Sequence, residues 1–349
     1  ILSLKPAQFF FFFFYSLYLW HWPIIVLYTY KTGPELLKFE KLWVFIACIL
    51  AGTAGYCLIE KPCMKKNISK PSFGAMMAAL TIAGVLAGSA FILTKGFETR
   101  FDPAVRKAAS YLDYKKSKPE NPCFLEEKTK ITDSAMMDSC VKIDPGKKNI
   151  LLLGDSHADH LYGAMAETLK NAQVTELASS GCRPLIGASG PQRCTGLFQR
   201  VMEKYLPENK FDVVILSGRW HEEDAALIAK TVAEISEHAK RVIVSGPIVT
   251  YTSAVPKLIA FSMIKGDEGK SVIAAQNKTS MAMDKKLREA AAQTGAEYFS
   301  VQDALCYDGA CQYETPDHTP MIFDTGHLTH QGAIIVMRAM DKELGLSAP

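Results

Sequence analysis

Three apolar stretches near the amino terminus constrain the fold of this chain more than any other feature. They cover Phe9–Tyr30, Leu42–Ile59 and Phe73–Thr94. Because a helix rises about 1.5 Å per residue, each stretch is long enough to cross or nearly cross the apolar core of a bilayer. Three successive spans joined by short polar loops do not resemble a cleaved signal peptide. The sequence therefore predicts three transmembrane α-helices that anchor the chain.

The lysines between these stretches predict an orientation. The loop 61–70 after the second stretch carries four lysines, and the loop 31–41 before it carries three. Short loops rich in Lys and Arg stay on the cytoplasmic side of a membrane. The favoured topology therefore has the loop 61–70 inside and everything after Lys95 outside, in the periplasm.

The region beyond Asn149 alternates between strand-like and helix-like segments. The expected strands are Ile150–Leu153, Val174–Ala178, Asp212–Ser217, Arg241–Gly246 and Glu297–Val301. The expected helices are Ala158–Lys170, Glu222–Lys240, Ser280–Thr294 and His330–Leu344. This alternation predicts an α/β domain with a parallel sheet that helices cover on both faces. About two hundred residues are enough for one buried core.

Two short motifs at opposite ends of this region carry residues suited to nucleophilic catalysis. Gly154-Asp155-Ser156-His157 follows the first expected strand, and Asp324-Thr325-Gly326-His327 precedes the last expected helix. The carboxyl ends of parallel strands are where open α/β sheets build their active sites. A serine needs a base, and the base needs a partner that fixes its tautomer. We expect Ser156 to be the nucleophile, His327 its base and Asp324 the partner of His327.

These motifs resemble the first and last blocks of the SGNH (GDSL-like) hydrolase family. The resemblance implies a flavodoxin-like, three-layer α/β fold, with an oxyanion hole formed by the backbone N–H groups of Ser156 and Gly181. The third block of the family normally carries an Asn, which is absent from Ser217–Trp220. Arg219 is a candidate substitute, and the alternative is that two backbone donors suffice. Arg219 and Trp220 can equally line the site or pack in the core.

Other polar residues near the two motifs have competing roles. His157, Asp159 and His160 suggest a metal site, because two histidines at i and i+3 can share a helix face, but we expect no metal. Asp155 is expected to cap the turn. His330 is the rival base to His327, although we expect it to begin the last helix.

Nine cysteines divide between the two parts of the chain. An oxidising compartment would pair the even set of six in the region beyond Lys95. We expect sequence neighbours to pair, because each pair brackets a short loop, although six cysteines allow fifteen connectivities. The expected disulfides are Cys123–Cys140, Cys182–Cys194 and Cys306–Cys311, and the expected free thiols are Cys48, Cys57 and Cys63. The second disulfide would brace the loop that holds Gly181.

The segments Tyr15–Pro23 and Ile59–Pro62 carry a second resemblance, to the carboxyl-terminal spans of the membrane acyltransferase family three. Members of that family transfer acyl groups, usually acetyl, to extracytoplasmic sugars, and some are fused through an extra span to a periplasmic SGNH domain. The resemblance implies acetyl-CoA as the cytoplasmic donor to the complete membrane enzyme. The simpler interpretation of Trp20–Trp22 is an interfacial aromatic belt, but His21 in a membrane segment is a functional candidate.

The early spans of that family, which carry its essential His and Arg, have no counterpart in this chain. We expect them to be lost by truncation or to be a separate polypeptide. The expected domains are the last two acyltransferase spans in 1–72, an additional span in 73–94, a connecting extension in 95–148 and the SGNH-like domain in 149–349.

Together these features predict an O-acetyltransferase of the bacterial inner membrane with its SGNH domain in the periplasm. Ser156 would carry the acetyl group to a hydroxyl of a surface polysaccharide such as lipopolysaccharide O-antigen. The alternatives are a periplasmic carbohydrate esterase and a catalytically inactive glycan-binding domain, which the missing Asn favours. The expected partners are the polysaccharide, the lipid bilayer and the missing spans. A net charge of +3 is too small to indicate nucleic acid, and no bound cofactor is expected.

Overall fold

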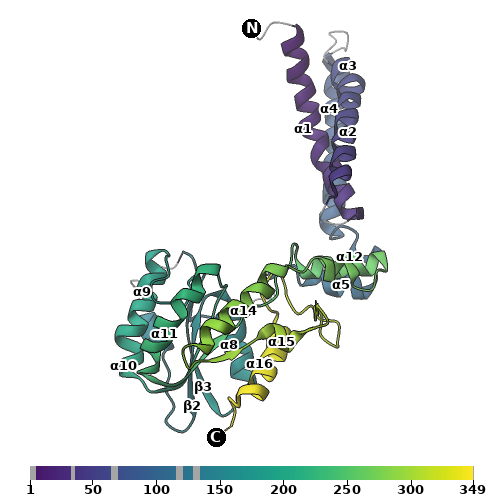
Figure 1. Ribbon diagram of the computed structural model, residues 1–349. Coiled ribbons are helices and arrows are strands. Elements are labelled where there is room, and N and C mark those ends of the chain that lie inside the picture. Colours follow the sequence, from purple (N-terminus) through teal and green to yellow (C-terminus); the bar gives the residue numbers. More distant parts are fainter. Residues whose placement is uncertain (1–4, 33–35, 64–69, 115–120, 129–133, 349) are drawn as a thin grey trace. The chain divides into compact units, whose positions relative to one another are not determined.

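The computed structural model describes residues 5–32, 36–63, 70–114, 121–128 and 134–348, with the backbone alone for 5–13, 70–72 and 134–136 (Figure 1). The chain forms two compact units, Ile1–Asp102 and Pro103–Pro349. The first unit consists of α1 (Lys5–Thr32), α2 (Lys38–Gly55), the π-helical turn η1 (Tyr56–Glu60), α3 (Lys61–Cys63), α4 (Lys70–Leu93) and the 3-10 turn η2 (Glu98–Arg100).

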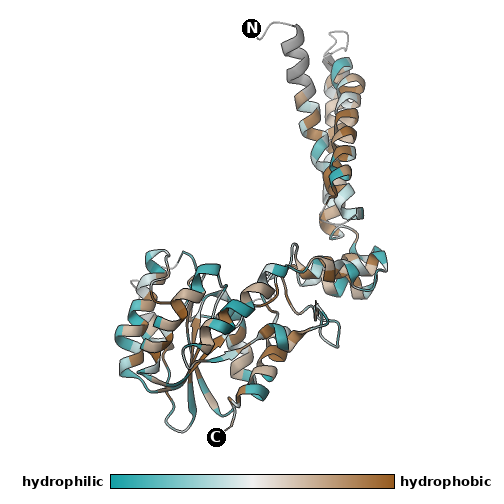
Figure 2. Cartoon of the chain, in the orientation of Figure 1, coloured by the Kyte–Doolittle hydropathy of each residue, from teal (hydrophilic) through white to brown (hydrophobic). Residues whose placement is uncertain are grey.

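Two helical segments in the described part of this unit are long and apolar enough to cross a membrane. They are Lys38–Cys63 and Phe73–Leu93, and Figure 2 shows the hydrophobic residues along both. They correspond to the second and third predicted spans. The first predicted span, Phe9–Tyr30, lies within α1, where side chains before Phe14 fall outside the described residues, so it stays a prediction.

Small residues on α2 let α1 pack closely against it. A Cβ atom at Gly52 would lie 3.1 Å from the backbone of Leu17, and one at Gly55 would lie 2.5 Å from the indole nitrogen of Trp20. The Ser16 hydroxyl adds a hydrogen bond of 2.5 Å to Glu60 in η1. Close approach of this kind, with a polar contact across the helix pair, is typical of helices that associate in lipid.

A six-stranded parallel sheet forms the centre of the second unit. Its strands are β1 (Phe124–Leu125), β2 (Lys148–Gly154), β3 (Ala172–Ser179), β4 (Phe211–Ser217), β5 (Ala239–Ser245) and β6 (Glu297–Phe299). Their order in space is β1-β3-β2-β4-β5-β6, and every neighbouring pair is parallel. From β2 onward this is the flavodoxin-like order, whose switch point lies between β2 and β4. Functional residues are therefore expected at the carboxyl ends of these two strands.

Helices cover both faces of the sheet. On one face, the apolar side chains of Leu151 and Leu153 belong to a core that includes Leu197 of α9 (Gln192–Arg200), Ile228 of α11 (Ala225–Ser236) and Leu287 of α14 (Lys278–Ala292). The alternate residues of β2 point to the other face, where α8 (Ser156–Thr168) and α16 (His330–Leu344) pack together (Figure 1). The predicted three-layer α/β architecture is confirmed.

The remaining elements are shorter or peripheral. They are α5 (Pro103–Ser110), α7 (Ser134–Cys140), η3 (Val201–Tyr205), α10 (Leu206–Glu208), η4 (Glu222–Asp224), α12 (Val255–Lys265), α13 (Lys270–Ala274), α15 (Val301–Leu305), β7 (Cys306–Tyr307) and β8 (Ala310–Cys311). Helix α5 packs on α12, and β1 pairs with β3 at the sheet edge. The segment 95–148 therefore supplies both a helix and a strand to the second unit.

Two predicted boundaries were wrong. The expected helix Glu222–Lys240 stops at Ser236, because Ala239 and Lys240 belong to β5, where Ala239 pairs with Phe211 of β4. The expected strand Glu297–Val301 ends at Phe299, because the side chain of Ser300 caps α15 by accepting the N–H of Asp303. In both places sheet pairing or capping overrides the local apolar pattern.

Candidate active site

The end of β2 and the start of α8 fix the position of Ser156. A Cβ atom on Gly154 would lie 1.7 Å from the carbonyl oxygen of Ser217 in β4, so only glycine lets the two strand ends approach this closely. Asp155 then caps α8, because its Oδ1 accepts the N–H of His157 at 2.8 Å. Ser156 is consequently the first residue of α8, at the carboxyl end of the sheet, and the predicted capping role of Asp155 is confirmed.

The carboxylate of Asp155 also joins the turns that follow β2 and β4. Its Oδ2 accepts the backbone N–H of Arg219 at 2.8 Å, and its side chain is almost completely buried. Burial raises the pKa of this carboxyl group, while the two N–H donors and the nearby positive charges of His327 and Arg219 partly offset the rise. One side chain therefore holds Arg219 in register with the start of α8.

A chain of hydrogen bonds connects Ser156, His327 and Asp324. The Ser156 Oγ atom lies 2.7 Å from Nε2 of His327, and Nδ1 of the same ring lies 2.6 Å from Oδ2 of Asp324. The other oxygen of Asp324 accepts the N–H groups of Gly326 and His327 at 2.8 and 2.7 Å. The fold thus brings together the three residues predicted as nucleophile, base and partner, from opposite ends of the domain.

Several backbone contacts hold the loop that carries His327. The two ends of this loop are joined by a hydrogen bond from the N–H of Phe323 to the carbonyl oxygen of His327 at 2.9 Å. The carbonyl oxygens of Asp324 and Thr325 accept the N–H groups of Val255 and Tyr251, each at 2.8 Å. The ring of Phe323 also stacks on the imidazole, with 5.7 Å between centroids. The imidazole is therefore oriented by packing as well as by Asp324.

The pKa of Asp324 is lower than usual. Partial burial raises it, but the hydrogen bond and positive charge of His327, followed by the N–H groups of Gly326 and His327, outweigh that effect. The carboxylate therefore stays ionised at neutral pH. An ionised partner at Nδ1 keeps the ring proton there and leaves Nε2 able to accept a proton from Ser156.

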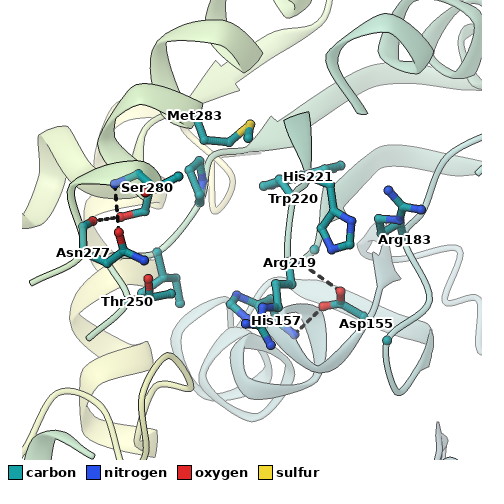
Figure 3. Close-up of a pocket in the computed structure, with 15 residues that line it drawn as sticks. Asp155, His157, Arg183, Arg219, Trp220, His221, Thr250, Asn277, Ser280 and Met283 are labelled. Atoms are coloured by element: carbon teal, nitrogen blue, oxygen red, sulfur yellow. Dashed lines mark hydrogen bonds between the residues drawn. The ribbon is translucent and has the colours of Figure 1, made fainter. Parts of the chain in front are cut away.

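A cleft of about 530 Å³ is lined by Asp155 and His157, the two sequence neighbours of Ser156, whereas Ser156, Asp324 and His327 are not among its lining residues (Figure 3). The turns after β2, β3 and β4 supply one wall, with Asp155, His157, Gly181, Arg183, Gly218, Arg219, Trp220 and His221. The other wall comes from Pro247, Ile248, Thr250, Asn277, Thr279, Ser280 and Met283. No sequence pattern marks this second wall, because its residues lie in a loop and at the start of α14, outside either motif.

Comparison with known proteins identifies the domain. A family model described as an SGNH domain fused to AT3 domains matches residues 122–342, which is more than half of the chain. The chain belongs to this SGNH family. Among curated proteins, none matches the sequence.

Several solved structures are similar to this chain. The periplasmic domain of a lipopolysaccharide acetyltransferase from Salmonella ser. Paratyphi A is 19% identical, with 68% of this chain and 96% of that chain covered and a TM-score of 0.57, which supports the fold. A carbohydrate acetylesterase from Sinorhizobium meliloti is 15% identical, with 57% and 99% covered and a TM-score of 0.38. A catalytic mutant of an acetylxylan esterase from Geobacillus stearothermophilus is 15% identical, with 59% and 97% covered and a TM-score of 0.34.

In the SGNH domain, the predicted oxyanion donors follow β2, β3 and β4. Gly181 has a φ of +65°, a left-handed conformation that favours glycine, and it lines the cleft. The backbone N–H of Arg219 is occupied by Asp155, so only the exposed guanidinium of Arg219 is available as a donor. The oxyanion roles of Ser156, Gly181 and Arg219 stay predictions.

Two histidines, the buried His157 and the half-buried His160, lie near the candidate base. The rings of His157 and His160 lie 5.1 and 6.1 Å from the ring of His327. Burial, followed by the positive charges of His327 and Arg219, lowers the pKa of His157 to about 3. Burial and the neighbouring histidines also lower the pKa of His160 well below its ordinary value. Both rings are therefore neutral, and no group of potential metal ligands forms among the described residues.

The structure also separates His330 from the site and accounts for the cysteines. His330 begins α16, and its Nε2 lies 2.8 Å from Glu167 rather than near Ser156. The predicted disulfides Cys123–Cys140, Cys182–Cys194 and Cys306–Cys311 all form, and Cys48, Cys57 and Cys63 are free, so the neighbour pairing is confirmed. Trp220 is buried and donates its indole N–H to the carbonyl of Ser245 at 2.8 Å, so it both packs and lines the cleft.

Proposed function

We propose that this protein is an extracytoplasmic O-acyltransferase that moves an acetyl group through Ser156 to a hydroxyl of a bacterial surface polysaccharide such as lipopolysaccharide O-antigen. The observation that carries the proposal is the hydrogen-bonded series Ser156–His327–Asp324 in a domain of the family fused to AT3 domains. The similarity in fold to the periplasmic domain of a lipopolysaccharide acetyltransferase is consistent with it.

In the first step, Ser156 Oγ attacks the carbonyl carbon of the acyl donor. Nε2 of His327 takes the hydroxyl proton as the new C–O bond forms, and Asp324 stabilises the resulting imidazolium. The backbone N–H groups of Ser156 and Gly181 stabilise the oxyanion. Collapse of the tetrahedral intermediate expels the leaving group, which takes the proton from His327, and leaves an acetyl ester on Ser156.

In the second step, a sugar hydroxyl takes the place of the leaving group. His327 removes its proton, the sugar oxygen attacks the ester carbon, and Ser156 leaves with the proton returned by His327. The partly open cleft gives room for an acceptor beside the serine. If water attacks instead, the same residues hydrolyse the ester, so exclusion of water by the acceptor decides between transfer and hydrolysis.

For the membrane part, we propose that the apolar helices belong to an acyltransferase membrane domain of family three. The SGNH domain would then face the periplasm of a bacterial inner membrane. Acetyl-CoA would supply the acetyl group on the cytoplasmic side through further spans, in cis or in trans. The family description, which names fusion to AT3 domains, and the apolar segments Lys38–Cys63 and Phe73–Leu93 support this arrangement.

Acetyl transfer by the full chain in detergent tests the proposal. The donor is p-nitrophenyl acetate labelled in the acetyl group, the acceptors are oligosaccharides, and Ser156→Ala is the comparison. Acetylated sugar from the wild type and none from Ser156→Ala is the expected result. Hydrolysis without transfer to any acceptor would favour a carbohydrate esterase. Failure of a fluorophosphonate to label the wild type would instead favour a glycan-binding domain without catalysis.

A further inference from the structure

The cleft beside Ser156 has an unbalanced charge. Two of its lining residues are arginines, and its one acidic lining residue, Asp155, is buried with both oxygens bonded to backbone N–H groups. Arg183 is neutralised locally, because its Nη1 lies 2.7 Å from the fully buried Asp224 and 2.9 Å from Glu223. The side chain of Arg219 is therefore left without an ion-pair partner among the residues that line the cleft.

The guanidinium of Arg219 is exposed and forms no ion pair or side-chain hydrogen bond within the described part of the chain. Its main chain is nevertheless fixed, since the Arg219 N–H donates to the buried carboxylate that also caps α8. Asp155 thus holds the main chain of Arg219 in a fixed position relative to the start of α8, where Ser156 lies. The His157 ring, which also lines the cleft, is neutral, because burial and then the positive charges of His327 and Arg219 lower its pKa to about 3.

The opposite wall of the cleft carries no charged side chain and combines apolar residues with hydroxyl and amide groups. Figure 3 shows Thr250, Asn277 and Ser280 across the cleft from Arg219. Asn277 uses its Oδ1 to accept the N–H of Thr279 at 3.0 Å, which leaves its amide N–H₂ for other partners. Hydroxyl and amide groups of this kind suit the hydroxyls of a sugar, whereas a free guanidinium suits an anion.

We propose that the acceptor is an acidic glycan whose anionic group pairs with Arg219 while its hydroxyls contact Thr250, Asn277 and Ser280. This inference rests on the proposed transfer function and names the substrate class for it. A sugar carboxylate and a sugar phosphate share the required chemistry, because a guanidinium can donate two parallel hydrogen bonds to either. Charge-assisted bonds of this kind at a partly exposed site predict about a five- to tenfold preference for an acidic acceptor over its neutral counterpart.

The test compares matched acceptors. Oligogalacturonate is paired with its carboxyl-reduced neutral form, and galactose 6-phosphate is paired with galactose. Each acceptor is offered to the full chain in detergent, and kcat/KM for acetyl transfer is measured. We expect Arg219→Gln to bring the acidic-to-neutral ratio of kcat/KM close to one. Arg219→Lys keeps the positive charge but loses the two parallel N–H donors of the guanidinium, so it should retain part of the preference for the acidic acceptor. Arg338→Gln, which removes an exposed arginine on α16, serves as the matched control and should keep the wild-type ratio. Using a ratio cancels every effect of Arg219 that is equal for all acceptors, including any effect on formation of the acetyl ester at Ser156.

The two pairs of acceptors also separate the two anion sources, because the preferred anion gives the larger acidic-to-neutral ratio. An unchanged ratio in Arg219→Gln, or a wild type that prefers the neutral acceptor, would overturn the inference. Calorimetric binding of oligogalacturonate to Ser156→Ala, with and without Arg219→Gln, keeps the two proposals distinguishable. Binding that depends on Arg219 without any transfer would refute the transferase function and leave the anion site standing. Equal binding by both proteins would refute the site.

Discussion

Replacing Asp324 by Asn is the sharpest perturbation of the candidate active site, because it alters one atom of the hydrogen-bonded series. The amide oxygen can still accept the N–H groups of Gly326 and His327, which lie 2.8 and 2.7 Å from Oδ1, so the loop should keep its shape. The amide N–H₂ would replace Oδ2 at 2.6 Å from Nδ1 of His327. Two donors cannot face each other at that distance, so the ring proton moves to Nε2.

The consequence is a serine without a base. With its proton on Nε2, His327 can no longer accept the hydroxyl proton of Ser156, which lies 2.7 Å away. The wrong tautomer costs about 10⁴-fold in a serine hydrolase, and at about 1.4 kcal/mol per tenfold this corresponds to about 5 kcal/mol of transition-state stabilisation. We therefore expect kcat/KM for p-nitrophenyl acetate to fall by about 10⁴-fold in the full chain.

The matched control is Asp317→Asn. Asp317 is an exposed carboxylate in the same part of the chain that bonds Thr315 and Thr319 rather than a histidine, so its variant should stay within about threefold of wild type. The melting temperatures of both variants should stay close to that of wild type. If Asp324→Asn, folded to the same extent, keeps more than about a tenth of the wild-type kcat/KM, the assignment of Asp324 as the partner of His327 is wrong.

Three further predictions test the surroundings of the site. The double change Cys182→Ser and Cys194→Ser removes a disulfide with a sequence separation of 12, which should lower the free energy of unfolding by about 3 kcal/mol. It should also lower the rate of ester hydrolysis, because the loop that holds Gly181 loosens. Thermal melting and steady-state kinetics measure the two effects, and an unchanged rate would count against the bracing role. Folding lowers the pKa of His157 from 6.5 to about 3, so between these pH values the unfolded state binds a proton that the folded state does not. The contribution of neutral His157 to the free energy of unfolding is therefore complete above pH 6.5 and falls by about 1.4 kcal/mol per pH unit below it. His157→Leu should reduce this slope, which unfolding curves at pH 7 and pH 5 measure. His327→Gln should abolish labelling of Ser156 by a fluorophosphonate, because it removes the base. His330→Gln breaks only a contact with the exposed carboxylate of Glu167, so this variant should be labelled at a rate within about threefold of wild type. The reverse result would identify His330 as the base.

The candidate triad was predictable because each member lies in a short motif whose role depends on local structure. Gly154 and Asp155 mark a strand that ends in a helix cap, and that cap sets the position of Ser156 whatever the rest of the chain does. Asp324 and His327 lie three residues apart, close enough for one turn to join carboxylate and imidazole. The two boundary errors arose because strand pairing of Ala239 and capping by Ser300 depend on contacts that the local pattern does not contain.

The cleft could not be predicted in the same way. Thr250, Asn277 and Ser280 lie across the cleft from Arg219 only because β5 lies beside β4 and because α14 packs against α11 in the assembled domain. The link from Asp155 to the N–H of Arg219 likewise requires that β2 and β4 be neighbours, although α8, β3 and α9 intervene between them in the sequence. No sequence pattern marks such residues, since their types are common in loops.

The sequence by itself therefore determined the features that depend on local composition: apolar stretches of membrane length, the alternation of strands and helices, the two motifs and the pairing of neighbouring cysteines. These follow from hydrophobic periodicity, turn chemistry and short loop closure, which act over a few residues. Only the tertiary structure decided that His327 rather than His330 lies beside Ser156, that Asp155 binds the N–H of Arg219, and that Arg219 faces a wall without charged side chains. Those relations arise from the order of the strands in the sheet, which brings together residues that are far apart in the chain.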